Sequence, residues 1–126
     1  MRKLSWLLIC LLLISYAALA AADDPRPVIG TWEGESICTV RPSPCHDEHV
    51  IYDITADKEK LSISMDKVVN GERENMGALP CTYKSSTLRC TFRDTVWTFA
   101  IKDKQMQGEL HLGDGTLYRR IKAQRK

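Results

Sequence analysis

Several side chains able to bind a metal or exchange protons lie together in the stretch Cys45-His46-Asp47-Glu48-His49. Imidazole and carboxylate groups are common ligands of zinc and copper, so a metal site with His111 as a third ligand is one hypothesis. On a strand, however, His46 and His49 would point to opposite faces. They could share an ion only if the backbone turned between them. A polar rim at the start of a strand is the alternative, and we predict no metal or other cofactor.

Paired carboxylates occur twice, at Glu33 and Glu35 and at Glu72 and Glu74. Each pair lies near the end of an expected strand, where charged side chains are usually solvated. The chain has no G-x-S-x-G elbow, no H-E-x-x-H helix and no phosphate-binding loop, and its cysteines are expected to form disulfides. We therefore predict a binding protein rather than an enzyme, without catalytic residues.

The first 22 residues have the pattern of a cleavable secretory signal peptide. Arg2 and Lys3 form a basic start, residues 4–15 are apolar, and Ala18-Leu19-Ala20 is an A-x-A cleavage box. Asp23 and Asp24 follow, instead of the basic flank of a membrane anchor. We expect a bacterial exported protein, periplasmic or secreted, with no stable membrane anchor.

The charge balance of the exported chain argues against nucleic-acid binding. Removing Arg2 and Lys3 leaves 16 of the 18 basic residues, against 16 acidic ones. A neutral chain lacks the basic stripe that binds phosphates, and we interpret the basic C-terminal run as a solvated end. About 104 residues suffice for one domain. We expect a monomer with an N-terminal arm at residues 23–29 and a barrel domain at 30–126.

Four cysteines follow the signal sequence, and an even number in an exported chain indicates two disulfides. A two-residue turn at Ser85-Ser86 would place Cys81 opposite Cys90 in a non-hydrogen-bonded pair, where strands lie closest. Cys38 and Cys45 enclose two prolines, which favour a loop that a bridge could close. We predict the pairings 38–45 and 81–90. A four-thiolate zinc site is the alternative, but its C-x₂₋₄-C spacing is missing.

Alternation of apolar and polar residues predicts strands along the whole domain. Residues 60–66 alternate without a fault, and residues 88–93, 96–101 and 106–112 follow the same pattern between turn signals such as Asn70-Gly71. Eight segments start near residues 30, 48, 60, 73, 87, 96, 106 and 116. Because closing such a meander removes its free edges, we predict an all-β, eight-stranded antiparallel up-and-down barrel. A flattened sandwich is the alternative.

The two ends of the domain resemble the lipocalin and avidin superfamily, in Gly30-Thr31-Trp32 of the first strand and Arg119-Arg120 of the last. In that superfamily the tryptophan of a G-x-W motif packs across the barrel floor, under an arginine from the closing strand. The resemblance implies that Trp32 forms the floor, that Arg119 or Arg120 covers it, and that the barrel holds a small apolar ligand. The chain is shorter than a typical lipocalin and lacks a signal for the helix that follows the barrel there.

An eight-stranded barrel is just wide enough to be filled by its own side chains or to hold one small ligand. The expected interior residues therefore either form a solid core or line a binding site. They are Trp32, Tyr52, Ile63, Met65, Phe92, Trp97 and Phe99.

In size, signal peptide, barrel and early tryptophan, the chain also resembles the small exported inhibitors of bacterial metalloproteases. Those proteins insert a free N-terminal arm into the protease cleft. The resemblance implies a protein partner bound through residues 23–29 or through the loop between Cys38 and Cys45. An ordinary disordered leader is the alternative for the arm. The inhibitors carry one disulfide, whereas two are predicted here.

Overall fold

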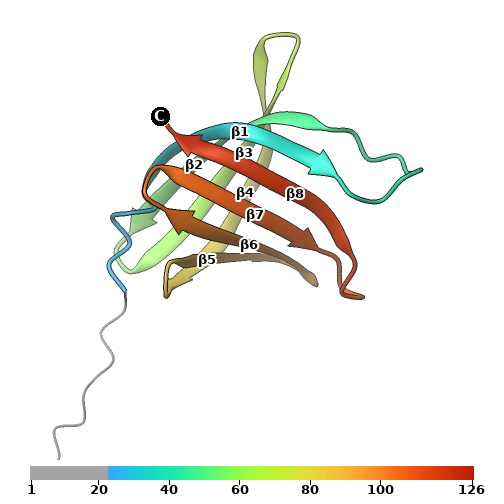
Figure 1. Cartoon of the computed structure of the whole chain (residues 1–126). Helices are drawn as coiled ribbons and strands as arrows, with labels where there is room; N and C mark the ends of the chain where they lie inside the picture. The colour runs from blue at the N-terminus through green and yellow to red at the C-terminus, as the bar shows by residue number, and fades with distance from the viewer. Residues whose placement is uncertain (1–22) are drawn as a thin grey trace, which may run out of the picture.

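The computed structural model describes residues 23–126, which form one closed β-barrel (Figure 1). Its strands are β1 (Gly30–Cys38), β2 (Glu48–Asp57), β3 (Lys60–Val69), β4 (Glu72–Lys84), β5 (Thr87–Phe92), β6 (Thr95–Lys102), β7 (Gln105–His111) and β8 (Leu117–Arg125). Each strand pairs antiparallel with the next, and β1 pairs with β8. The predicted eight-stranded barrel is confirmed, and each strand begins within one residue of its predicted start.

The predicted signal peptide lies outside the described residues. Within residues 23–126, no helix is long and apolar enough to cross a membrane.

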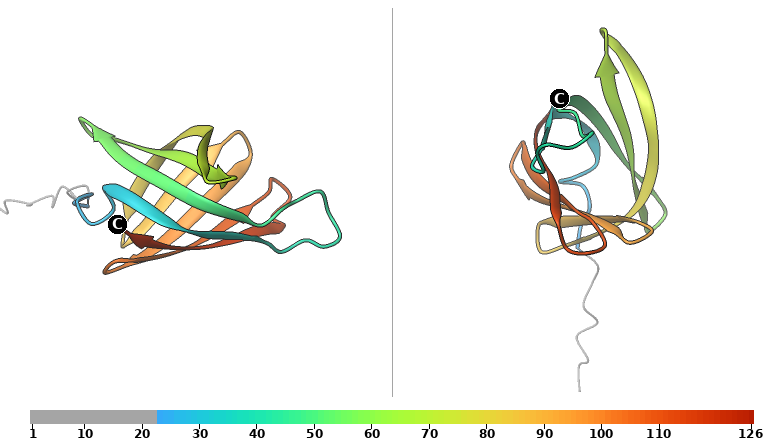
Figure 2. Two further views of the ribbon diagram at one scale, coloured as in Figure 1. Left: turned by 90° about the horizontal axis from the view of Figure 1, so that it is seen from above. Right: turned by 90° about the vertical axis from the view of Figure 1, so that its right-hand side faces the viewer.

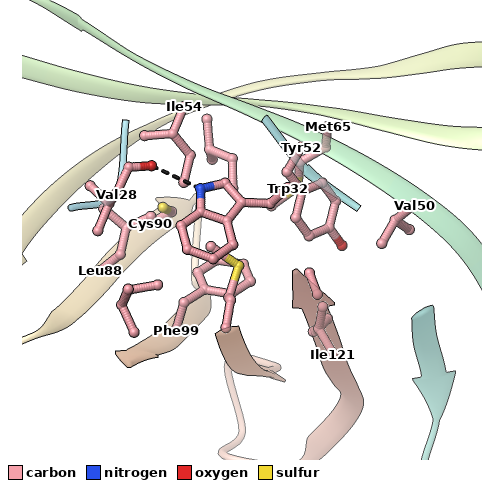
Figure 3. Close-up of a cluster of buried hydrophobic side chains, with 14 of the residues drawn as sticks. Val28, Trp32, Val50, Tyr52, Ile54, Met65, Leu88, Cys90, Phe99 and Ile121 are labelled. Carbon is pink, nitrogen blue, oxygen red and sulfur yellow. Dashed lines mark hydrogen bonds between the residues drawn. The ribbon is translucent and has the colours of Figure 1, made fainter. Parts of the chain in front are cut away.

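The core forms because alternate residues of every strand point into the barrel. Figure 3 shows these side chains packed around Trp32, which is fully buried. Tyr52 meets Phe99 edge to face with ring centroids 5.9 Å apart, and Phe99 stacks on Trp97 at 6.2 Å. The buried cluster contains Val28, Trp32, Val50, Tyr52, Ile54, Leu61, Ile63, Met65, Leu88, Cys90, Phe99, Ile101, Met106, Ile121 and Ala123.

The barrel floor is the end at which β1 begins and β8 ends, and Trp32 closes it. The Trp32 ring donates its Nε1–H to the Val28 carbonyl at 2.9 Å, and the Arg125 guanidinium lies 5.0 Å from the ring centroid. The covering arginine is therefore Arg125, and the expectation of Arg119 or Arg120 was wrong. In the β1–β8 register Arg125 lies opposite Trp32, whereas Arg119 lies six residues away and the exposed Arg120 points outward.

The segment before β1 folds under the floor instead of projecting as a free arm. Val28 is fully buried, and its N–H bonds the Pro25 carbonyl at 2.9 Å. Arg125 fixes the same segment because its guanidinium donates to the carbonyls of Ile29, at 2.6 Å, and of Pro27. Residues 25–29 are thus part of the folded domain.

Both predicted disulfides are confirmed, which rules out the four-thiolate zinc site. Cys81 and Cys90 are directly paired across β4 and β5, with Cα atoms 4.1 Å apart. The turn between them has positive φ at Ser85 (51°) and Ser86 (61°), the signature of a type I′ hairpin. The second bridge joins Cys38 to Cys45 across the loop between β1 and β2.

Candidate functional site

The end of the barrel opposite Trp32 is hollow, and we call it the mouth. It is bounded by the connections 39–47, 70–71, 93–94 and 112–116. A pocket of about 250 Å³ opens there. The residues that line it are Glu48, Met65, Met76, Leu79, Phe92, Thr95, Trp97, Leu110 and Arg119. Apolar side chains make up most of this lining, as is typical of small-molecule sites.

A polar cluster of Ser36, Glu48, Tyr52 and Arg119 lies beside the pocket: Glu48 and Arg119 line it, whereas Ser36 and Tyr52 are buried and do not. The Arg119 guanidinium donates to the Ser36 hydroxyl at 3.1 Å and lies 3.5 Å from a Glu48 carboxylate oxygen. The side chains of Arg119 and Glu48 are only 12% and 20% exposed, respectively. A largely buried charged pair therefore lines one side of a mostly apolar pocket.

The Tyr52 hydroxyl is held in its neutral form in this cluster. Burial is the main reason that its pKa is raised well above the ordinary value of 10.0, and the nearby Glu48 carboxylate raises it further. The positive charge of Arg119 and a hydrogen bond with Ser36 act in the opposite direction. Tyr52 therefore serves this site as a neutral hydroxyl.

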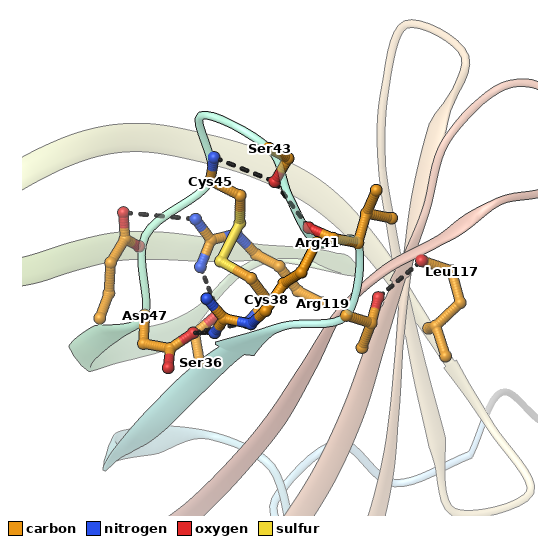
Figure 4. Close-up of a disulfide and its surroundings, with 11 residues drawn as sticks. Ser36, Cys38, Arg41, Ser43, Cys45, Asp47, Leu117 and Arg119 are labelled. Carbon is orange, nitrogen blue, oxygen red and sulfur yellow. Dashed lines mark hydrogen bonds and ion pairs between the residues drawn. A yellow bond between two sulfur atoms is a disulfide. The ribbon is translucent and has the colours of Figure 1, made fainter.

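The disulfide loop forms the rim of the mouth on the side of Arg119 (Figure 4). Asp47 holds the loop in place because its Oδ1 accepts the Cys38 N–H at 2.8 Å and an N–H of Arg41 at 2.6 Å. The hydrogen bond from Cys38 is the main reason that the pKa of Asp47 is lowered. Cys38 and Cys45 are themselves buried. The bridge thus fixes the rim against the strand that carries Ser36.

The barrel wall is parted beside the mouth, between β4 and β5. The pairing of these strands covers only Cys81–Lys84 of β4, whereas residues 72–80 pair with β3 alone. The two-residue turn makes Lys84 and Thr87 a hydrogen-bonded pair. Hydrogen-bonded and non-hydrogen-bonded pairs alternate along an antiparallel ladder, so the following hydrogen-bonded pairs are Thr82 with Arg89 and then Pro80 with Thr91. Proline has no N–H to donate, so the pairing stops there.

The β3–β4 hairpin consequently rises beyond the rest of the barrel (Figure 2, right). Arg73 braces this hairpin, since it pairs with Asp53 and Asp66 at 2.7 Å each. Met76 and Phe92 are 45% and 53% exposed on the two sides of the parting. Apolar side chains thus extend from the pocket to the outer surface.

The structure divides the seven predicted interior residues into two groups. Trp32, Tyr52, Ile63 and Phe99 lie in the packed core and are at most 1% exposed. Met65, Trp97 and Phe92 line the pocket. The expectation that Phe92 fills the interior was wrong: it has the inward parity of Leu88 and Cys90, but it is the last residue of β5 and lies at the parted wall.

Sequence reasoning missed the charged residues that line the mouth pocket and the apolar residue at its outer lip. Glu48 was considered only as a metal ligand, and Arg119 as a floor residue or as part of a solvated basic C-terminal run, whereas its side chain is only 12% exposed. Counting alternate residues from Tyr52 and from Ile121 places Glu48 and Arg119 on the inward side of their strands. A charged side chain at an inward position is unusual, so this pattern was a usable signal. Met76 follows no alternation, since the register of β3 and β4 shifts beside it.

The two candidate metal-binding histidines are not brought together. His46 is exposed in the loop, whereas His49 lies on the outer wall with its Nδ1 2.8 Å from Glu35 and its Nε2 2.8 Å from Glu33. These contacts, the Glu35 contact foremost, raise the pKa of His49. Among residues 23–126, no three His, Cys, Asp or Glu side chains are placed to hold a metal ion. The other carboxylate pair, Glu72 and Glu74, is exposed on the hairpin.

Larger hollows lie elsewhere on the described surface, but they are a weaker basis for a site. One of about 420 Å³ lies on the outer wall, against polar residues such as Thr98, Gln107 and Lys122. Another of about 360 Å³ lies at the floor between residues 23–25 and the ends of β2 and β4. The mouth pocket differs because inward-facing apolar side chains line it and a largely buried charged pair borders it.

Comparison with known proteins supports the fold alone. No protein-family model matches the chain, and no curated protein sequence matches it. Among solved structures, a protein of unknown function from the DUF3598 family of Nostoc punctiforme PCC 73102 is similar, with a TM-score of 0.50 and 14% sequence identity. The similarity covers 83% of this chain and 50% of that protein, so the present chain spans about half its length.

Proposed function

We propose that this protein is an exported, lipocalin-like carrier that binds one small apolar molecule at the mouth of its barrel. The observation that carries the proposal is the pocket of about 250 Å³ above the packed core. Its inward-facing side chains, such as Met65, Trp97 and Leu110, are apolar and border the pocket instead of packing against other side chains on that side. Covering them with an apolar ligand would release about 25 cal/mol for each Å² removed from water.

The parted wall favours a small ligand over a protein strand as the occupant. An unpaired strand edge invites strand addition, but this edge carries features that oppose it. Pro80 offers no N–H, a register shift distorts the strand beside Met76, and the edge begins with Glu72-Arg73-Glu74. We therefore assign the exposed apolar side chains at the parting to ligand entry.

A protease-inhibitor function receives less support from the structure. Such a function needs a segment that can reach into another protein, whereas residues 25–29 are fixed under the floor by Arg125 and by burial of Val28. The two formed disulfides support export, because such bridges persist in oxidising compartments.

The proposal is tested by titrating the mature protein with the neutral fluorescent dye N-phenyl-naphthylamine. We expect saturable binding of one dye per protein, with a blue-shifted emission. The variant Leu79→Arg places a charge in the pocket wall and should abolish the binding. Ala78→Arg is the matched control, because Ala78 is the neighbouring residue but is exposed on the opposite face of β4. Absence of saturable binding to the wild type, or equal binding by the two folded variants, would overturn the proposal.

A further inference from the structure

We infer that the ligand of the mouth pocket carries a carboxylate and that Arg119 binds this group. The inference rests on the proposed function and adds the chemical class of the ligand. Its starting point is a guanidinium that lies inside the barrel, 12% exposed, where the apolar lining of the pocket ends.

The hydrogen-bonding capacity of Arg119 exceeds what its neighbours use. A guanidinium has five N–H donors, and here it meets the Ser36 hydroxyl at 3.1 Å and one Glu48 oxygen at 3.5 Å. The second distance is well beyond the roughly 2.7–2.9 Å of a strong charge-assisted hydrogen bond. Among residues 23–126 no buried side-chain nitrogen or oxygen lacks a partner, so the remaining N–H groups of Arg119 reach water, which the acceptor oxygens of a ligand in the pocket would replace.

Glu48 also borders the pocket, so the sign of the ligand's charge must be decided between the two partners. Arg119 is the more buried of the pair, with its side chain 12% exposed against 20% for Glu48. Arg41 and Asp47 at the rim already pair with each other at 2.6 Å. An anion on Arg119, competing with Glu48, is thus the favoured arrangement.

The geometry of a carboxylate fits this position. Its two oxygens can take two N–H groups of one guanidinium side by side. Ser36 accepts an N–H of Arg119 and, like Tyr52, is only 1% exposed, so a ligand in the pocket would meet the guanidinium itself. The pocket volume corresponds to about eight heavy atoms, at roughly 30 Å³ for a water-sized group. A longer apolar tail would leave through the parted wall across Phe92 and Met76.

The test compares three probes with the same eight-carbon chain, namely octanoate, octanol and octylamine, as competitors of the neutral dye. We expect octanoate to bind the wild type about tenfold or more tightly than octanol, and octylamine to bind most weakly. Arg119→Gln should remove the preference for octanoate over octanol. Glu48→Gln should strengthen octanoate binding, because it removes the competing carboxylate. Arg120→Gln, on the outer face of the same strand, is the matched control.

Equal binding of octanoate and octanol, tightest binding of octylamine, or weaker octanoate binding by Glu48→Gln would overturn the inference. If the dye binds and the headgroups are not distinguished, the inference fails and the proposed function stands. If the wild type binds neither the dye nor any probe, both fail. The result for Glu48→Gln does not depend on whether Arg119→Gln folds, so the inference remains open to refutation in either case.

Discussion

Arg125→Met tests whether a single side chain fixes both the floor of the barrel and the segment before β1. The Arg125 guanidinium lies over the Trp32 ring and donates hydrogen bonds to the carbonyls of Ile29 and Pro27. Methionine has a similar length and can still cover the ring with apolar atoms, but it has no N–H groups. The substitution therefore removes the polar contacts and leaves much of the packing in place.

The size of the expected loss can be worked from these contacts. Two hydrogen bonds from a charged donor contribute about 1.5 kcal/mol each, the lower value because the group is partly exposed. The cation–π contact adds about 0.5–1 kcal/mol. We expect the free energy of unfolding to fall by about 3.5–4 kcal/mol, and Tm to fall by at least about 14 °C for a domain of this size.

The assay is urea unfolding followed by tryptophan fluorescence, together with amide hydrogen exchange of residues 25–29. Exchange at the Val28 N–H should accelerate, since its bond to the Pro25 carbonyl depends on the docked segment. The control is Arg120→Met, because Arg120 is exposed on the outer face of β8. If Arg125→Met stays within about 0.5 kcal/mol of this control, or exchange is unchanged, the account of the floor is refuted.

Three further predictions concern the wall. The pKa of His49 is raised in the folded protein, so the stability that His49 contributes is complete below its unfolded pKa of about 6.5 and is lost as the pH rises through its folded pKa. In parallel urea titrations, His49→Gln should destabilise the protein by under about 1 kcal/mol at pH 5.5 and hardly at all at pH 9. At Gly34 a Cβ would lie 1.8 Å from the Lys122 carbonyl oxygen, so Gly34→Ala should cost about 3 kcal/mol or more by distorting the β1–β8 seam; an unchanged urea midpoint would contradict this. Replacing Cys81 and Cys90 by alanine should cost about 2–3 kcal/mol by releasing the closed loop, and a Tm equal to that of the wild type would refute this value.

The face on which a residue lies could be predicted from the sequence, because it depends only on alternation along a strand. The alternating run at 60–66 defined the inward side of β3, and the two-residue turn at Ser85-Ser86 fixed the register that pairs Cys81 with Cys90. These are local properties of the chain. They were sufficient for the barrel, its strands and both disulfides.

The depth of a residue along the barrel axis could not be predicted in the same way. Depth depends on how far each strand is displaced against its neighbours, which is set by the closure of the whole sheet. Arg119 and Arg125 have the same inward parity on β8, yet one lies under the mouth and the other at the floor. Phe92 likewise has inward parity, but the early end of the β4–β5 pairing leaves it 53% exposed.

The parting of the wall at Pro80 could have been inferred from the sequence once the register of the β4–β5 hairpin was accepted. The turn at Ser85-Ser86 makes every second pair a hydrogen-bonded one, and Pro80 falls on such a position without an N–H. Pro80 is visible in the sequence, but it indicates the end of the pairing only when the register of β4 against β5 is known. The polar cluster beside the pocket needs the full structure, because it joins residues from β1, β2 and β8.

The central claim is that the mouth of the barrel holds a small molecule, and native mass spectrometry of the mature protein from its own exported pool tests it most directly. The account predicts a non-covalent additional mass on the wild type and on Ala78→Arg, lost on denaturation and absent from Leu79→Arg. The intact mass under denaturing, non-reducing conditions serves as the reference and should show both disulfides. A bare mass for all three proteins, or the same additional mass on Leu79→Arg, would contradict the account.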